Sequence, residues 1–285
     1  MTPPAITVLM AVYNGGSFLR TAIDSILVQS YADFEFLVVD DASIDDTPEI
    51  VRSYCDPRIR LQVLPRNVGQ TAALNAGLES IRSPWIARMD ADDFSARVRF
   101  EEQMTIAKAD PRIGCVGTCA WFFRNDPSIR DATLTLPTAH EDIIKKLLWS
   151  SPLIHSTLLI RTNDLRKVGG YDLRYRYSAD LELYDRLTTF TRATNIGKPL
   201  HGLRRHLQQD SYSLKAIRET VELLGNRLDS ERYTRNQRAT IRASKHLHEA
   251  LGAMSERRYA SFAAHVACSF ATSPSLTVKH IVERV

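Results

Sequence analysis

Short apolar runs alternate with amphipathic segments along the first ninety residues of the chain. The runs are continuously apolar, which is typical of strands buried on both faces of a parallel sheet. They predict strands over residues 6–12, 34–39, 59–64 and 85–89. The segments between them favour helices, most clearly over residues 18–27 and 70–81. This alternation predicts an α/β fold, with a mostly parallel sheet flanked by helices and right-handed crossovers.

The pattern is less regular after about residue 118. Upstream of that point, residues 97–107 predict a helix and residues 113–117 a short strand. Residues 156–160 resemble another strand, and from residue 213 to about residue 271 the chain is polar and helix-prone. We therefore expect two halves, over 1–117 and 118–212, and a helical C-terminal extension over 213–285.

Acidic residues follow two of the predicted strands at their carboxyl ends, where parallel sheets bind ligands. Asp40 and Asp41 close one strand, and Asp90, Asp92 and Asp93 close another. Because side chains alternate along a strand, Asp90 and Asp92 are expected on one side, roughly 7 Å apart. Such a pair suits Mg²⁺ or Mn²⁺, which could hold a diphosphate. A solvated acidic turn is the alternative for this D-x-D spacing taken alone.

Charge is distributed unevenly along the chain. From His201 onward 14 Lys and Arg stand against 8 Asp and Glu, a net charge of +6. The whole chain carries +4, so the first 200 residues carry −2. The basic tail could face anionic lipid, nucleic acid or an anionic acceptor, and a solvated helical surface explains it equally well.

Cysteine usage and hydropathy indicate the compartment. The four cysteines form no C-x-x-C pair, which favours reduced thiols over a zinc site. The sequence shows no signal-peptide pattern and no apolar run that approaches 18 residues. We therefore expect a cytoplasmic protein, which could contact the inner face of the cell membrane peripherally.

The last predicted helix offers a route to such a contact. Phe262, Val266 and Phe270 are spaced by four behind the basic pair Arg257 and Arg258. An apolar stripe with flanking arginines suits a helix that lies on a membrane surface. Packing against the protein's own helices is the favoured interpretation.

Six motifs occur in the order found in family 2 glycosyltransferases, which the chain resembles over roughly residues 5–213. They are Val8-Leu9-Met10-Ala11-Val12-Tyr13-Asn14, Val38-Val39-Asp40-Asp41-Ala42-Ser43, Arg66-Asn67-Val68-Gly69, Met89-Asp90-Ala91-Asp92-Asp93, Val168-Gly169-Gly170-Tyr171-Asp172 and Ala179-Asp180. The resemblance implies a GT-A fold over 1–212, with a Rossmann-like nucleotide-sugar-binding half (1–117) and an acceptor-binding half (118–212). It also implies a Mg²⁺ or Mn²⁺ cofactor and inversion at the anomeric carbon.

The resemblance also implies roles for residues of the first half. Asp92 becomes the leading metal ligand, with Asp90 near the metal or the ribose and Asp93 in support. Asp41 falls at the nucleobase position, where it could accept the imide N–H of uracil or thymine, so a UDP or dTDP sugar is expected. Turn capping is the alternative for Asp40 and Asp41. The remaining nucleotide contacts are assigned to Ala11, Tyr13, Asn67 and Gly69, and a plain connection explains the last two nearly as well.

Inversion requires a general base that takes the proton of the acceptor hydroxyl. Asp180 matches the family's base, although Ala179 replaces the preceding acid of the usual Glu-Asp pair. Helix capping is the alternative role for Asp180, and Glu182 is the fallback base. His206 could complete the metal site or touch the diphosphate, whereas a solvated histidine is the plainer interpretation. For His155 a structural role is favoured over acceptor contact.

Processive members of the family carry Gln-x-x-Arg-Trp after the base, and this chain does not. The sequence therefore predicts an enzyme that transfers a single sugar from a nucleotide-diphosphate sugar to a saccharide or lipid-linked saccharide. The expected setting is cell-surface polysaccharide or glycolipid synthesis, without a nucleic-acid partner. Two rivals stay open: a nucleotidyltransferase, and a catalytically silent module that binds a nucleotide sugar or a partner enzyme.

Overall fold

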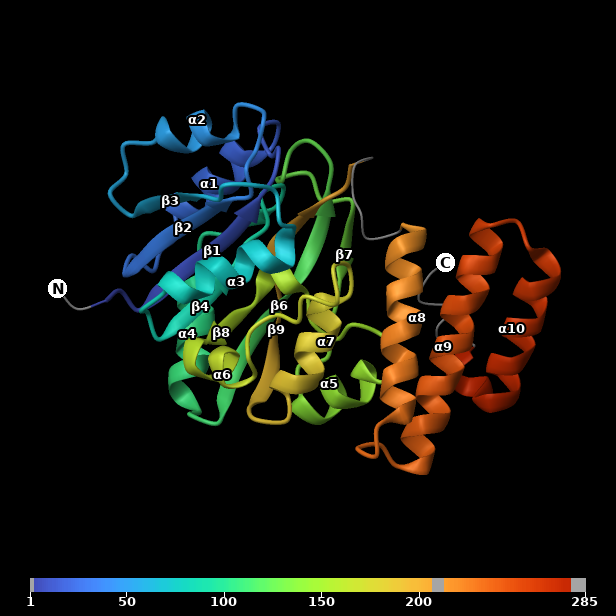
Figure 1. The fold of residues 1–285 in the computed structure, drawn as a ribbon. Coiled ribbons are helices and arrows are strands. Elements are labelled where there is room, and N and C mark those ends of the chain that lie inside the picture. Colours follow the sequence, from blue (N-terminus) through green and yellow to red (C-terminus); the bar gives the residue numbers. More distant parts are fainter. Residues whose placement is uncertain (1–2, 207–212, 278–285) are drawn as a thin grey trace. The chain divides into compact units, whose positions relative to one another are not determined.

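The computed structural model describes residues 3–206 and 213–277, which divide into two compact units (Figure 1). One unit holds the described residues up to Ile143, with Pro152–Leu173 and the residues from Leu183 to His206. The other holds Ile144–Ser151, Arg174–Glu182 and the C-terminal helices. Two short segments from before residue 212 thus join the C-terminal helices in one unit. The domain boundaries at residues 117 and 212 stay predictions.

A nine-stranded mixed sheet forms the centre of the first unit. Its strands are β1 (Ile6–Val12), β2 (Phe34–Asp40), β3 (Ile59–Val63), β4 (Trp85–Arg88), β5 (Phe94–Ser95), β6 (Ile113–Phe123), β7 (Ala132–Leu134), β8 (Leu159–Arg161) and β9 (Arg192–Arg204). Their order is β3-β2-β1-β4-β8-β6-β9-β5, and β7 pairs with β6. The first four strands run parallel to one another, whereas β8 is antiparallel to both β4 and β6.

Helices connect these strands and cover the sheet. They are α1 (Leu19–Leu27), α2 (Thr47–Arg52), α3 (Gln70–Ser80), α4 (Arg99–Ala109) and α6 (Thr162–Lys167), with a 3₁₀ turn η1 (His155–Thr157). Two further helices, α5 (His140–Leu147) and α7 (Ala179–Leu187), contain residues of both units. A mixed sheet flanked by helices, followed by C-terminal helices, confirms the expected α/β class.

Strand β1 is buried on both faces, as its continuous apolar run predicts. Val8 and Met10 belong to the core cluster that also contains Ile23 of α1 and Phe100 of α4. Leu9, between them, faces α3 on the other side of the sheet. A Cβ atom added to Gly77 of α3 would lie 2.5 Å from Leu9 Cδ1, so this glycine allows the close approach of helix and strand.

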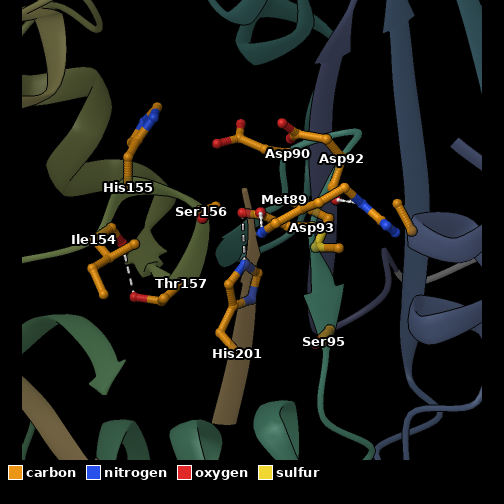
Figure 2. Close-up of polar contacts among 12 residues, drawn as sticks. Met89, Asp90, Asp92, Asp93, Ser95, Ile154, His155, Ser156, Thr157 and His201 are labelled. Atoms are coloured by element: carbon orange, nitrogen blue, oxygen red, sulfur yellow. Dashed lines mark hydrogen bonds and ion pairs between the residues drawn. The ribbon is translucent and has the colours of Figure 1, made fainter. Parts of the chain in front are cut away.

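Two expected strands differ from those observed. Strand β6 continues to Phe123, beyond the predicted 113–117, because β9 pairs with it along its length. The strand predicted over 156–160 begins only at Leu159. The hydroxyl of Thr157 donates to Ile154 O at 2.8 Å, and this local bond closes η1 in place of a strand (Figure 2).

The C-terminal part of the second unit includes the helices α8 (Leu214–Asp229), α9 (Arg235–Ser255) and α10 (Tyr259–Thr272). Side-chain caps fix the starts of two of them: Ser213 caps α8, and Thr234 forms a capping box with Gln237 at α9. The helix-prone C-terminal region is therefore confirmed. No helix in the described part of the chain is long and apolar enough to cross a membrane.

Candidate functional site

The D-x-D loop lies immediately beyond the carboxyl end of β4, which ends at Arg88. The sequence had suggested that the alternation of side chains along a strand positions Asp90 and Asp92. The strand ends before both residues, so this alternation does not position them. The turn places both carboxyl groups on the same side nevertheless, whereas Asp93 points towards His201 of β9 (Figure 2). The expected pairing of the two carboxylates is therefore reached by a different local structure.

Arg88 anchors Asp90 to the sheet. Its side chain is fully buried, and its guanidinium donates to Leu9 O at 2.7 Å and to Met89 O at 3.0 Å. The other terminal nitrogen, Nη2, lies 2.6 Å from Asp90 Oδ1, in an ion pair whose carboxylate is 30% exposed. One carboxylate oxygen of Asp90 is thus bound to Arg88 of the sheet, while the carboxylate stays partly exposed to solvent.

His155 and Tyr171 extend this chain of contacts. Arg88 Nε donates to His155 Nε2 at 3.3 Å, and the same nitrogen lies 2.8 Å from the Tyr171 hydroxyl. Burial, together with the charge of Arg88, holds the pKa of His155 well below its usual range, so the imidazole is neutral. His155 therefore has the structural role that the sequence favoured.

The Gly169-Gly170-Tyr171 motif fixes the tyrosine. Both glycines adopt positive φ angles, of 83° and 70°, a region that favours glycine. Asn75 of α3 then accepts from the Tyr171 amide at 2.9 Å and donates to its carbonyl at 2.8 Å. The turn thereby connects α3 to the hydrogen-bond network of Tyr171, His155 and Arg88.

Asp93 is buried, and both of its oxygens are engaged. Oδ1 accepts from the Arg204 amide at 3.1 Å, and Oδ2 lies 3.0 Å from His201 Nε2. Arg99, also buried, donates to His201 Nδ1 at 2.8 Å, to Ser156 O and to Arg88 O. These contacts hold the D-x-D loop against β9.

Burial shifts the pKa values of Asp93, Arg99 and His201. It raises the pKa of Asp93 to about 7, against the hydrogen bonds of Ser156 and Arg204 and the charge of Arg99. It lowers the pKa of Arg99 to about 9, and burial and the Arg99 charge hold the pKa of His201 well below its usual range. A neutral histidine thus stands between an arginine and a carboxylate.

Asp92 contacts the segment that follows β9. Its Oδ2 lies 2.8 Å from His206 Nε2, while its carbonyl accepts from Arg204 Nε at 2.8 Å. Burial and the neighbouring charge of Asp93 raise the pKa of Asp92, and the His206 bond opposes that rise. The Phe18 ring packs 4.8 Å from the His206 ring. The structure thus brings His206 to the D-x-D loop.

The donor set of this loop fits a hard divalent cation. The carboxylates of Asp90 and Asp92 lie on the same side and are each 30% exposed. Carboxylate oxygens of this kind are the ligands that Mg²⁺ and Mn²⁺ prefer. Asp93 supports the loop through its buried contacts, and its own contact with a metal stays a prediction.

The acids that end β2 bind the neighbouring loops. Asp40 accepts from the Ser43 amide at 3.3 Å, which is the turn-capping role considered for it. The two oxygens of Asp41 accept from the amides of Val68 and Gly69, at 2.7 and 2.8 Å. Asp41 thereby shapes the loop before α3. Its contact with a nucleobase stays a prediction.

The remaining nucleotide candidates line the same edge of the sheet. Ala11 is buried in β1, whereas Tyr13 beyond it is 47% exposed. Asn67 is exposed in the loop before α3, and Gly69 begins that helix with a φ of 88°. All four are placed at or near the carboxyl ends of parallel strands.

Asp180 belongs to the second unit, at the first turn of α7. There it lines a pocket of about 240 Å³ whose wall combines aromatic and hydroxyl-bearing side chains. The lining residues include Trp149, Tyr177, Ser178, Thr220, Ser244 and His248. Asp180 Oδ1 also accepts from the Leu181 amide at 2.7 Å, a contact at the start of the helix. The capping and catalytic interpretations are compatible with each other.

Similarity to known proteins decides the family. The family model described as glycosyl transferase family 2 matches residues 7–169. The chain belongs to glycosyltransferase family 2. This glycosyltransferase is 30% identical over 225 residues to EpsE of Bacillus subtilis (strain 168), itself named as a glycosyltransferase, and the match covers 77% of this chain and 79% of EpsE. ExoO of Rhizobium meliloti (strain 1021), named as a succinoglycan biosynthesis protein, is 44% identical over 99 residues, which are 33% of this chain and 28% of ExoO.

Solved structures confirm the GT-A fold. One similar structure is the mannosyltransferase PcManGT from Pyrobaculum calidifontis, in complex with GDP-Man and Mn²⁺. Its TM-score is 0.66 at 18% sequence identity, and the match covers 100% of this chain and 82% of the PcManGT chain. S. aureus TarS 1–349 in complex with UDP-GlcNAc has a TM-score of 0.65 at 13% identity, covering 93% and 91%. The expected family, fold and enzyme class are therefore confirmed, and the enzyme acts on a nucleotide sugar.

Sequence reasoning missed three residues of the glycosyltransferase's D-x-D loop network. Arg88, Arg99 and His201 are each fully buried and polar, and none was considered functional. Arg88 alone carried a readable signal, since it is a charge inside an otherwise apolar strand, and such a charge requires a buried partner. The other two come from distant segments that contain no such anomaly.

Proposed function

We propose that this glycosyltransferase transfers a single sugar from a UDP or dTDP sugar to an acceptor hydroxyl, with inversion and with a Mg²⁺ or Mn²⁺ cofactor. The observation that carries the proposal is the pair of partly exposed carboxylates on Asp90 and Asp92, held on one side of the loop by Arg88 and His206. A divalent cation bound by this pair would neutralise the charge of the departing diphosphate.

The chain's own residues divide the remaining work. Arg88 orients Asp90, and the buried contacts of Asp93 keep the loop attached to β9. Asp41 and Gly69 would position the nucleotide beside that loop, with Ala11, Tyr13 and Asn67. His206, already in contact with Asp92, would approach the diphosphate.

Asp180 is the proposed general base. The acceptor oxygen attacks the anomeric carbon, the bond from that carbon to the diphosphate oxygen breaks, and the acceptor's proton passes to the Asp180 carboxylate. The pocket that Asp180 lines supports this role, because aromatic faces and hydroxyl groups suit a saccharide. Glu182 stays the alternative base.

The setting of the reaction follows from the relatives' names. ExoO is named for succinoglycan biosynthesis, which favours a polysaccharide or its lipid-linked precursor as the acceptor. The two similar structures carry different nucleotides, UDP-GlcNAc in TarS and GDP-Man in PcManGT. A test of the UDP or dTDP expectation must therefore include GDP.

Thermal stabilisation by nucleotides tests the donor site. UDP, dTDP, GDP and CDP would each be added with and without Mn²⁺ to the wild type, to Asp92→Asn and to the control Asp33→Asn, which alters an exposed residue just before β2. One nucleotide should stabilise the wild type and the control with Mn²⁺, by about 2.7 kcal/mol at a hundredfold excess over the dissociation constant.

The outcomes separate the proposal from its rivals. The stabilisation should disappear in Asp92→Asn. If no nucleotide stabilised the folded wild type, the donor site would be refuted and a partner-binding module would be favoured. Release of inorganic diphosphate from a sugar phosphate and a nucleoside triphosphate would instead identify a nucleotidyltransferase.

We also propose that the enzyme works at the inner face of the cell membrane, which it contacts peripherally through α10. Phe262 and Val266 are half-buried, but Tyr259 and Phe270 are 67% and 50% exposed beside Arg257 and Arg258. Exposed apolar side chains next to arginines suit an anionic lipid surface. Full-length enzyme should cosediment with anionic vesicles, and Tyr259→Ser with Phe270→Ser should weaken that binding. Equal sedimentation of both proteins would contradict the contact.

A further inference from the structure

Three potential metal ligands converge on the C-terminal helices, among residues that take no part in the proposed transfer. His246 and Glu249 belong to α9 and His265 to α10, two helices that pack side by side (Figure 1). Glu249 Oε2 lies 2.9 Å from His246 Nδ1 and 3.2 Å from His265 Nδ1. All three ligand atoms lie within 4.8 Å of one another.

The helix geometry explains why they meet. His246 and Glu249 are three residues apart, so they share one face of α9. On α10, His265 stands one turn before Ser269, whose hydroxyl donates to Ala243 O of α9 at 3.0 Å. This buried bond fixes α10 against α9 next to the cluster, and it brings His265 over the Glu249 carboxylate.

We propose that His246, Glu249 and His265 bind a Zn²⁺ ion that ties α10 to α9. In a tetrahedral zinc site with bonds of about 2.0–2.1 Å, neighbouring ligand atoms lie about 3.3 Å apart. The observed distances of 2.9 and 3.2 Å need little adjustment to reach that value. Two imidazoles and one carboxylate are a common protein ligand set for zinc, with water in the fourth position.

The ligand chemistry distinguishes this cluster from the D-x-D loop. Imidazole nitrogens favour Zn²⁺ and other late transition metals, whereas oxygen ligands alone favour Mg²⁺ and Mn²⁺. Lys245 Nζ lies 3.6 Å from the other Glu249 oxygen, Oε1, and its charge opposes a cation, but it leaves Oε2 to the metal. The two sites should therefore be separable by the metal that is offered.

A metal link would stabilise a helix that lies along α9 but buries few of its own side chains. Ser269 is the one residue of α10 that is fully buried among the described residues, and both Tyr259 and Phe270 are largely exposed. Because a bound ion stabilises the folded form to which it binds, zinc should protect α10 from local opening. The effect should be confined to the C-terminal helices.

Zinc titration of the full chain tests the proposal. Metal-free protein carrying Cys55→Ser and Cys268→Ser, which remove the exposed thiols, would be titrated with ZnCl₂ in a calorimeter. We expect one Zn²⁺ per chain, and at least about tenfold weaker binding in Glu249→Gln and in His265→Gln. The matched control His140→Gln, a histidine of α5, should bind as the parent does.

Hydrogen exchange supplies the second measurement. Zn²⁺ should slow amide exchange in α10 of the parent and leave it unchanged in His265→Gln, whereas Mg²⁺ should have no effect on α10 in either. Equal zinc binding by the parent and both ligand variants would overturn the proposal, as would zinc-independent exchange in α10. Either result would leave the three residues as a hydrogen-bonded cluster only.

Discussion

Replacing Asp93 by asparagine should destabilise the first unit strongly, although the change is nearly isosteric. The reason lies in the direction of the hydrogen bonds around it. Arg99 has only donors, so His201 must accept at Nδ1, and the neutral ring then carries its proton on Nε2. Asp93 therefore receives at least three donors, namely this N–H, the amide of Arg204 and the Ser156 hydroxyl.

Asparagine offers a single oxygen, so its amide group must face at least one of these donors. A buried donor without an acceptor costs about 1–3 kcal/mol. At a pH above the raised Asp93 pKa of about 7, the substitution also removes a negative charge beside buried Arg99. Loss of one member of a buried pair costs about 3–5 kcal/mol. Arg99 keeps its bonds to Ser156 O and Arg88 O, so the lower end applies. We expect a total of about 4 kcal/mol.

Thermal unfolding followed by circular dichroism measures the effect. At about 2–4 °C per kcal/mol, the transition should fall by about 8–16 °C. Asp33→Asn, the same change at an exposed position, should shift it by less than about 2 °C. A similarly small shift in Asp93→Asn would refute the assignment of proton positions in the buried network.

Three further outcomes are expected. Asp180→Asn should lower the rate of sugar transfer about 10²–10⁴-fold and leave nucleotide binding unchanged in thermal-shift assays; parallel loss of both would contradict a role as base. Burial raises the pKa of Cys115 to about 12, and Cys119 is buried as well. A thiol reagent should therefore modify only Cys55 and Cys268 in the folded enzyme, and rapid labelling of all four thiols would disprove this. Chelation should abolish transfer, Mg²⁺ or Mn²⁺ alone should restore it, and each acceptor should gain one sugar by mass spectrometry; undiminished transfer in chelator would exclude the metal requirement.

Local pattern was sufficient to predict the edge of the sheet where the acidic residues lie. A continuous apolar run specifies a strand that is buried on both faces, and β1 is such a strand. Acidic residues just past two parallel strands then had to lie at the same edge of the sheet, as Asp41 and Asp92 do. The prediction failed where a local side-chain bond overrode the pattern, as Thr157 did by closing η1.

The support of the D-x-D loop could not be predicted, because it is built from contacts between residues far apart in the chain. His201 meets Asp93 across 108 positions, and His206 meets Asp92 across 114. Neither histidine is marked by local periodicity, since β9 would form equally well with another residue facing the loop. What selects His201 is the charge at the end of β4: the buried carboxylate of Asp93 requires donors, and β9, on the other side of β6, supplies them. His206, which follows β9, was suggested by the family resemblance and not by any local pattern. The sequence thus reveals the acids that are proposed to face the ligand, whereas the buried residues that fix their geometry become visible only in the fold.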